Sequence, residues 1–430
     1  MLSLSLLSLV TCLVPLSRAT PLQPRGVNLG WPYGSQKIRG VNLGGWLVLE
    51  PFITPTLFEN TGNDGIVDEY TFGQYQDHNT ARAALTQHWD TWITEDDFAR
   101  IAGAGLNHVR IPIGYWAYDI SAGEPYVQGQ APYLDKAIGW ARNHGLKVII
   151  DLHGAPGSQN GYDNSGQRGD ARWAYDSNNV YRTKKVVEQL SRQYSDPSYW
   201  QVVTALAILN EPATYMSDYF RDVTRQYNYD AYGAARYPWA PEGSASKSGL
   251  AIVVHDGFQP ISYFDNYLNE PNFESVILDH HQYTVFSNGE IAMDDQTRLN
   301  SICSKAGEFS SSQLWLVVGE WSLAATDCAR WLNGRGIGAR YDGSYPGSSA
   351  VGSCEGKSGD GSNFSNEYKT YLRKFWDTQT QVYENNGQGW VFWTWKTESA
   401  AEWSYSAGLA GGWIPYNPTE HVNSLSSLCT

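Results

Sequence analysis

The chain has 430 residues, of which 42% are apolar and 17% are charged, so it can bury a large core and has no long segment with a disordered composition. Its formal net charge of −14 argues against a nucleic-acid partner, because binding to the phosphate backbone depends on clustered Lys and Arg. A neutral substrate fits this composition better, and one large domain is the simplest organisation, since barrel domains routinely exceed about 250 residues.

The N-terminus is predicted to be a cleaved signal peptide at residues 1–19. These residues read MLSLSLLSLVTCLVPLSRA and end in Ser17-Arg18-Ala19, a small-x-small pattern that suits signal peptidase. The apolar run is too short to span a bilayer comfortably. The C-terminal sequence NSLSSLCT lacks the apolar tail of a lipid-anchor signal. We therefore expect a secreted protein without a membrane anchor.

From residue 38 onward, apolar runs alternate with polar or amphipathic segments. The runs are nearly continuous in apolar character, as expected for strands that are buried on both faces of a parallel sheet. Eight strands and their helices close a (β/α)8 TIM barrel, so we predict a single α/β domain over residues 38–430, preceded by an N-terminal segment at residues 20–37. The eight predicted strands are residues 38–48, 108–113, 147–152, 202–209, 250–254, 275–278, 314–318 and 389–395.

Segments between these runs are predicted to be crossover helices or long loops. No clear helix pattern precedes the seventh strand. Residues 154–176 and 333–362 are rich in Gly, Ser, Asp and Asn and are predicted to be long loops after the third and seventh strands. Loops at this end of a barrel build its binding site. The predicted helices are residues 94–104, 131–144, 179–194, 215–232 and 366–385.

Cysteine usage is typical of an exported protein. Outside the signal peptide there are four cysteines, which predict two disulfides in an oxidising compartment, although their spacing does not choose among three pairings. None has the spacing of a structural zinc site. Asn363-Phe364-Ser365 is an N-glycosylation sequon. The four cysteines are Cys303, Cys328, Cys354 and Cys429.

Polar side chains gather at the C-terminal ends of the predicted strands. A charged group there costs desolvation energy unless it is paired, and barrel enzymes place their catalytic groups at this end. A single carboxylate could equally be a turn residue or part of a structural ion pair, but two carboxylates that follow different strands favour a catalytic site. The residues concerned are Arg110, His153, Asn210, Glu211, His281, Tyr283 and Glu320.

Glu211 and Glu320 are suited to glycoside hydrolysis with retention of configuration. In that reaction one carboxyl group protonates the leaving oxygen and a second, about 5 Å away, attacks the anomeric carbon. Asn210 can hydrogen-bond the sugar 2-hydroxyl. Arg110 is expected to lower the pKa of Glu320 and keep it ionised, whereas Glu211 needs a raised pKa to carry a proton.

Structural roles compete with catalytic ones at several positions. His153 and His255 could belong to a metal-dependent hydrolase, but no HxH pair accompanies them, so we expect no metal and no cofactor. His280 and His281 are adjacent and therefore point to opposite sides of a strand, so one of them is expected to be structural. Four further acids are expected either to have structural roles or to support the site residues without contacting the substrate: Asp151, Asp163, Asp279 and Asp327.

The chain resembles the family-5 glycoside hydrolases, and specifically the fungal exo-β-1,3-glucanases of that family. LNEP alone would be a weak signal, but long blocks in a fixed order are highly specific. Tyr162 is a mild departure, because these enzymes tend to carry Phe at this position. The resemblance covers nearly all of the chain after the signal peptide, through IRGVNLGGWLVLEPFITPTLFE, HVRIPIGYWA, DLHGAPGSQNGYDNSG, ILNEP, DHHQYTVF, VVGEWSLAATDCARWLNG and VFWTWKTESAAEWS.

The resemblance implies a role for each candidate residue. Glu211 would be the acid/base and Glu320 the nucleophile. Tyr162 and Phe286 would clamp the second sugar, with Phe258 in a further aromatic subsite. The disulfides would join Cys303 to Cys429 and Cys328 to Cys354. The cleaved glucose would be contacted by Glu50, Arg110, His153, Asn210, His281, Tyr283 and Trp393.

The implied function is a secreted, extracellular or cell-wall exo-β-1,3-glucanase. It would release glucose from non-reducing ends with retention, transfer some glucose to sugar acceptors, and act as a monomer on β-glucan polysaccharides or oligosaccharides. Two alternatives stay open: the same fold acting as a β-glucosidase or β-1,6-glucanase, and a non-catalytic glucan-binding protein of the cell wall. The presence of both carboxylates speaks against the second.

Overall fold

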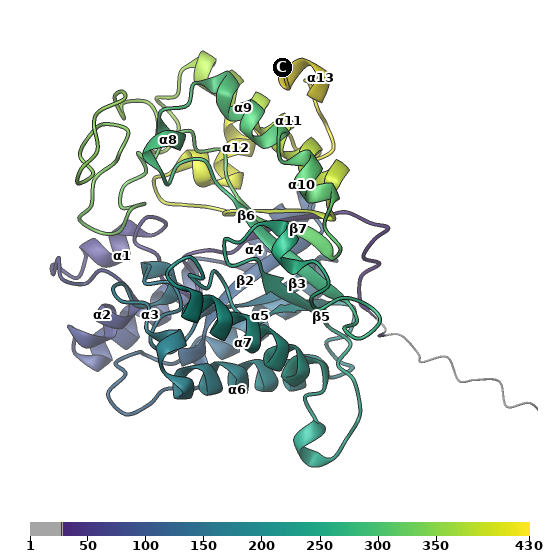
Figure 1. Cartoon of the computed structure of the whole chain (residues 1–430). Helices are drawn as coiled ribbons and strands as arrows, with labels where there is room; N and C mark the ends of the chain where they lie inside the picture. Colours follow the sequence, from purple (N-terminus) through teal and green to yellow (C-terminus); the bar gives the residue numbers. More distant parts are fainter. Residues whose placement is uncertain (1–26, 28) are drawn as a thin grey trace, which may run out of the picture.

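The barrel predicted from the sequence is present in the computed structural model, which describes residues 27 and 29–430; the predicted signal peptide lies outside the described residues. Eight parallel strands follow one another in sequence order and close when β8 pairs with β1 (Figure 1). This confirms the predicted fold class. The strands are β1 Ile38–Asn42, β2 His108–Gly114, β3 Lys147–Gly154, β4 Val203–Ala207, β5 Ala251–His255, β6 Val276–Gln282, β7 Trp315–Trp321 and β8 Gly389–Phe392.

Helices surround the barrel, and the long α6 and α7 lie side by side on one flank (Figure 1). The α-helices are α1 Pro55–Glu59, α2 Glu69–Gln74, α3 His78–Thr91, α4 Glu95–Gly103, α5 Ala131–Asn143, α6 Ser177–Tyr194, α7 Asp218–Arg236, α8 Asn288–Ile291, α9 Asp295–Cys303, α10 Ala306–Ser310, α11 Asn366–Asn386, α12 Tyr405–Gly411 and α13 Leu425–Leu428. Short 3-10 helices are η1 Tyr115–Ala117, η2 Asp163–Ser165, η3 Trp173–Tyr175, η4 Ala240–Glu242, η5 Ile261–Phe264 and η6 Ala401–Trp403.

Side-chain caps fix where the predicted helices begin. The Thr94 and Asp97 side chains form a capping box at α4, whose first turn is acidic and so complements the helix dipole. Helix α7 starts three residues later than predicted, because the Ser217 hydroxyl accepts the Phe220 amide and ends the preceding loop. Helices α9 and α10 occupy the connection for which the sequence showed no clear helix.

Three predicted strands are too long, and one of them is β4, which was predicted over residues 202–209 and is observed at Val203–Ala207. Strand β1 ends at Asn42, although the prediction ran to residue 48, and β8 ends at Phe392, although the prediction ran to residue 395. The continuations are turns whose residues are just as buried and apolar as the strands. Hydrophobicity alone therefore could not mark these strand ends.

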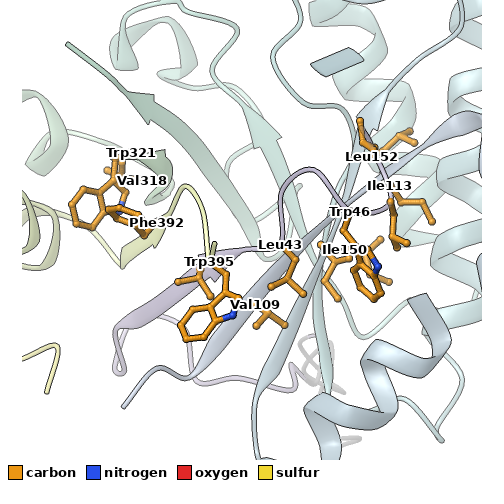
Figure 2. Close-up of a cluster of buried hydrophobic side chains, with 14 of the residues drawn as sticks. Leu43, Trp46, Val109, Ile113, Ile150, Leu152, Val318, Trp321, Phe392 and Trp395 are labelled. Carbon is orange, nitrogen blue, oxygen red and sulfur yellow. The ribbon is translucent and has the colours of Figure 1, made fainter. Parts of the chain in front are cut away.

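The barrel interior is apolar at one end and charged at the other. In β3, Ile149 faces inward at the apolar end, and the next inward residues, Asp151 and His153, belong to the charged end. The apolar end is filled by Ile38, Ile149, Ala205, Ala207, Ala251, Val253, Ile277, Val317 and Val391, with Tyr33 packed among them. Outward-facing residues form a larger cluster with the helices; Figure 2 shows Val109, Ile113, Ile150, Leu152, Val318, Trp321 and Phe392 from four strands.

Both implied disulfides are confirmed. Cys303–Cys429 joins the end of α9 to the C-terminus, and Cys328–Cys354 closes the long loop after β7. Asp327 holds the same loop by accepting hydrogen bonds from the Arg340 and Tyr341 amides at 2.7 and 3.0 Å. Within the described part of the chain, no helix has the length and apolar character needed to cross a membrane.

Candidate active site

A cavity of about 520 Å³ opens at the C-terminal ends of the strands, where the charged residues gather. Both predicted loops contribute to its wall. Of the residues predicted for the site, eight line the cavity and the other four lie against them, as the contacts below describe. The lining residues are Glu50, Phe52, Tyr162, Asp163, Asn164, Arg168, Glu211, Tyr215, Phe258, Tyr283, Phe286, Glu320, Leu332, Asn333, Gly334, Arg340, Tyr345, Trp393 and Trp403.

Glu211 and Glu320 meet at one histidine. The Nδ1 atom of His281 lies 2.8 Å from Oε1 of Glu211 and 3.4 Å from Oε2 of Glu320. Because both contacts are to one atom, these two carboxylate oxygens lie within the sum of the distances, about 6 Å. Retaining glycosidases have carboxyl groups about 5–5.5 Å apart, whereas inverting ones need roughly 6.5–9.5 Å to admit a water. The separation favours retention.

A register shift between β6 and β7 places His281 opposite Glu320. The β6–β7 ladder is irregular between His280 and His281, and beyond it His281 pairs with Glu320. His280 points away from the site, bonds Asp256 and packs against Phe309, which confirms that one of the two histidines is structural. The alternation of side chains along β6 separates the two histidines, and the irregularity places His281 opposite Glu320.

Glu320 is held by two donors. Nη1 of Arg110 donates to Oε1 at 2.7 Å, and the Tyr283 hydroxyl donates to Oε2 at 3.0 Å. Arg110 is buried, and its guanidinium also donates to Oδ1 of Asn42 and of Asn210, each at 2.8 Å. The two oxygens of Glu320 are thus fixed in direction before a substrate arrives, which is the preorganisation that a nucleophile needs.

Gly319 makes room for this arrangement. A Cβ atom at that position would overlap the carboxylate of Asp279. Asp279 in turn lies 3.8 Å from Arg110 and 3.5 Å from Nε2 of His281. Only glycine lets the β7 backbone approach this buried acid closely enough for Glu320, the next residue, to reach the site.

Glu211 is held in a sparsely populated backbone conformation. Its φ is 43°, in the left-handed region that side chains other than glycine seldom adopt, and such positions gather at functional sites. Nδ2 of Asn164 donates to its Oε2 at 3.2 Å, while His281 contacts Oε1. The surroundings therefore dictate where the carboxyl group points.

The pKa shifts of the two carboxylates run opposite to the sequence-based expectation. Burial raises the pKa of Glu211, but the hydrogen bond and charge of His281 overcome it and bring the pKa to about 2. Burial raises the pKa of Glu320 above its usual value, although His281 and Arg110 oppose it. The expectation is wrong for this state because His281, whose own pKa is raised well above 6.5 by Glu320 and Asp279 against burial, carries the proton. His281 and Glu211 thus share one proton across a 2.8 Å contact.

Several buried polar atoms around the cavity have no hydrogen-bond partner among the described residues, including Oε1 of Glu50, Nε2 of His153 and Nδ2 of Asn210. Asp151 orients His153 by contacting its Nδ1 at 2.6 Å, and the imidazole stacks on Trp393 at 5.5 Å. Buried polar atoms are costly when unpaired. A ligand with several hydroxyl groups would satisfy them.

The sequence analysis missed several wall residues. Asp163 was assigned a structural or supporting role, yet it lines the cavity, and burial next to Asp68 raises its pKa to about 7. Asn164, Arg168 and Arg340 also lie in loops, where no periodic pattern distinguishes a side chain that faces the cavity. The only signal for them was the Gly- and Asn-rich composition that marked the two loops as long.

Metal binding is the other chemistry that the residue types allow. Ligand atoms of Glu211, His255 and His281 lie within 4.8 Å of one another. Two ligands of a tetrahedral zinc ion, each about 2.0–2.1 Å from the metal, would be roughly 3.3 Å apart. The His281–Glu211 distance of 2.8 Å is that of a hydrogen bond, and Nδ1 of His255 accepts the Gly257 amide at 2.8 Å. The geometry fits a proton-sharing pair better than a metal centre.

Comparisons with known proteins identify the family of the chain. The profile of the family described as Cellulase (glycosyl hydrolase family 5) matches residues 69–334. Two relatives named glucan 1,3-beta-glucosidase are each 44% identical: that of Blumeria graminis over 96% of this chain and 94% of its own, and that of Kluyveromyces lactis over 96% of both. The crystal structure of rutinosidase from Aspergillus niger aligns with a TM-score of 0.68 over 91% of this chain and 100% of that chain; at 19% identity this likeness concerns the fold.

Proposed function

Because this chain belongs to glycosyl hydrolase family 5, we propose that it is a retaining exo-β-1,3-glucanase that releases glucose from the non-reducing ends of β-1,3-glucan. The observation that carries the mechanism is the shared contact of Glu211 and Glu320 with His281, which leaves too little room for an intervening water. We infer the β-1,3 linkage of the substrate from the relatives, which are named glucan 1,3-beta-glucosidase.

The reaction proceeds by double displacement. Glu320 attacks the anomeric carbon while Glu211 gives its proton to the departing oxygen, and Glu211 then deprotonates the water that releases glucose. The proton comes from the pair that Glu211 forms with His281: when it moves from Nδ1 to Oε1, His281 becomes neutral and Glu211 becomes the acid. Arg110 and Tyr283 keep contact with Glu320 throughout and favour its ionised form.

The remaining site residues bind sugar. The free atoms of Glu50, His153 and Asn210 are suited to hydroxyl groups of the cleaved glucose, and Asn210 to its 2-hydroxyl in particular. Trp393, stacked on His153, offers an apolar surface to the ring. Tyr162 and Phe286, both exposed at the mouth, clamp the second sugar, and Phe258 serves a further subsite.

Action at chain ends follows from the loops that wall the cavity. Residues 162–168 and 332–345 both contribute lining side chains, and the second loop is held by Cys328–Cys354 and by Asp327. Arg335 ties it to the segment before α2 by donating to the Ile66 carbonyl at 2.7 Å. A wall fixed at this many points ends the groove behind the terminal glucose.

Secretion completes the proposal. The N-terminal sequence and two disulfides support export to the medium or the cell wall, with Asn363, which is exposed, as a glycosylation site. We propose a monomer that needs neither metal nor cofactor.

The test is product analysis by NMR on laminari-oligosaccharides, which reports chain end, linkage and anomeric configuration together. β-Glucose should appear first, from the non-reducing end, with laminarin cleaved faster than pustulan. Glu320→Gln should lower kcat by at least about a thousandfold while glucan binding persists, and the exposed Glu355→Gln should behave as wild type. An α-anomer as first product would exclude double displacement. Faster cleavage of pustulan would point to a β-1,6-glucanase, and binding without cleavage to a wall-binding protein.

A further inference from the structure

Exposed aromatic side chains continue outward from the cavity. Tyr162, Tyr215 and Phe258 line its mouth and are 48%, 54% and 42% exposed. The Tyr162 and Tyr215 hydroxyls are hydrogen-bonded at 2.8 Å, and the Tyr215 ring packs edge-on against Phe258 at 5.6 Å. The hydroxyl by which Tyr162 differs from Phe therefore joins the clamp to Tyr215.

Two further exposed tyrosines lie close to Ser217, which is two residues after Tyr215. Tyr175 and Tyr219 are 54% and 56% exposed and stack on each other, with ring centroids 5.5 Å apart and an interplanar angle of 12°. The hydroxyl of Tyr175 contacts the hydroxyl of Ser217 at 3.1 Å, and Ser217 caps α7. One capped turn thus carries Tyr215 before the cap and Tyr219 after it.

These exposed rings are held in place. Tyr175 packs edge-on against Phe220, which is buried under the first turn of α7. A side chain that is already ordered loses little entropy when a ligand binds to it. Exposed aromatic surface that is contiguous with a cavity marks a binding site.

We propose that Tyr175, Tyr215 and Tyr219, here called the aromatic track, bind glucose units of a glucan chain beyond those held inside the cavity. The inference rests on the proposed function and adds to it a site for the distant part of the substrate. Tyrosine suits the role because its ring packs on the apolar face of a sugar while its hydroxyl stays in water. The flanking charges of Asp218 and Arg221 pair with each other at 2.9 Å, which leaves the track for a neutral ligand.

The test compares long and short substrates in the variant Tyr175→Ala/Tyr219→Ala. The ratio of kcat/KM on laminarin to kcat/KM on a small aryl β-glucoside should fall about tenfold, through KM for laminarin; tenfold is about 1.4 kcal/mol, which burying roughly 50 Å² of apolar surface supplies. Tyr175→Phe/Tyr219→Phe keeps the rings and should largely restore the ratio. Tyr416→Ala removes an exposed tyrosine elsewhere and is the control.

The other possible results refute either the aromatic track or the proposed function. An unchanged ratio in a folded double variant refutes the track and leaves the proposed function standing. If wild type releases no glucose from laminarin, the proposed function fails, and pull-down on insoluble β-1,3-glucan then judges the track by whether the double variant binds less. If the double variant does not fold, Tyr219→Ala takes its place. A wild-type dimer that the variant abolishes assigns the surface to a second copy and refutes the proposal.

Discussion

We expect the stability of this enzyme to depend on pH through Glu402. Its side chain is fully buried in η6, and neither carboxylate oxygen has a hydrogen bond of ordinary geometry. Burial raises its pKa to about 8, against smaller lowering by its own backbone amide and Ser358. Trp403, the next residue, lines the cavity and packs near Phe286 at 6.3 Å. Ionisation of Glu402 would therefore loosen a segment that carries part of the sugar site.

The sign follows from linkage between protonation and folding. A carboxyl group with a raised pKa in the folded state contributes stability that is fully present below pH 4.5 and is lost as the pH rises through about 8. At 1.36 kcal/mol per pKa unit, the full shift from 4.5 to about 8 corresponds to on the order of 5 kcal/mol for a group with no solvent exposure. Glutamine keeps the shape and stays neutral, so Glu402→Gln should abolish this loss.

The assay is urea unfolding of wild type and Glu402→Gln between pH 5 and pH 9 with the disulfides intact. The free energy of unfolding of the variant, relative to wild type, should rise by a few kcal/mol across this range. Glu69 and Asp163, with pKa values near 7, act in the same direction in both proteins and cancel in the difference. Glu355→Gln is the exposed control. A constant difference between wild type and Glu402→Gln at all pH values would refute the reasoning.

Three further predictions concern the site. Tyr162→Ala should weaken the use of laminari-oligosaccharides more than hydrolysis of a small aryl glucoside, because the clamp holds the second sugar; equal losses in kcat/KM would contradict it. Gly319→Ala should cost about 1–3 kcal/mol of stability through overpacking, and it should lower kcat at least tenfold, because the added Cβ would overlap Asp279. The control is Gly139→Ala in α5, where the added Cβ meets no atom within 4 Å; it should change neither the melting temperature nor the activity. The acid limb of the kcat/KM profile should lie above pH 4.5, because burial raises the pKa of Glu320 and the nucleophile must be ionised. Activity should fall again at alkaline pH, when the Glu211–His281 pair loses its proton. An acid limb below pH 4 would contradict the assignment of Glu320 as nucleophile.

The sequence predicted the barrel because eight apolar runs stand in a fixed order between amphipathic helices. Helix α5 was predicted within one residue, since its apolar spacing and Gly145 mark both limits. The end of β1 was missed because Leu43 and Trp46, beyond the strand, are as buried as the strand itself. Residues 43–48 are apolar because they are buried, and their apolar character does not show whether the backbone is extended.

The candidate site was predictable where a residue ends a strand. Glu320 stands near the end of β7 and Glu211 follows the end of β4, whereas Arg110 lies within β2 and not at its end as predicted; the structure nevertheless brings the three together. Asn42, which accepts a hydrogen bond from Arg110, was missed because the strand predicted over residues 38–48 places it inside the strand and not at its end. The pairing of His281 with Glu320 follows a register shift between β6 and β7, which no local pattern in the sequence records.

The apolar end of the barrel makes the active site a dead end. Alanine and valine side chains from opposite strands, covered by Tyr33, close the passage through the barrel, so nothing reaches Glu320 from below. Under the proposed mechanism, the attacking water and any incoming sugar must therefore enter through the same opening after the first product leaves. Tyrosine and phenylalanine rings surround this opening and can stack on a sugar. We therefore expect transfer of glucose to a sugar acceptor to compete with hydrolysis when glucan is abundant.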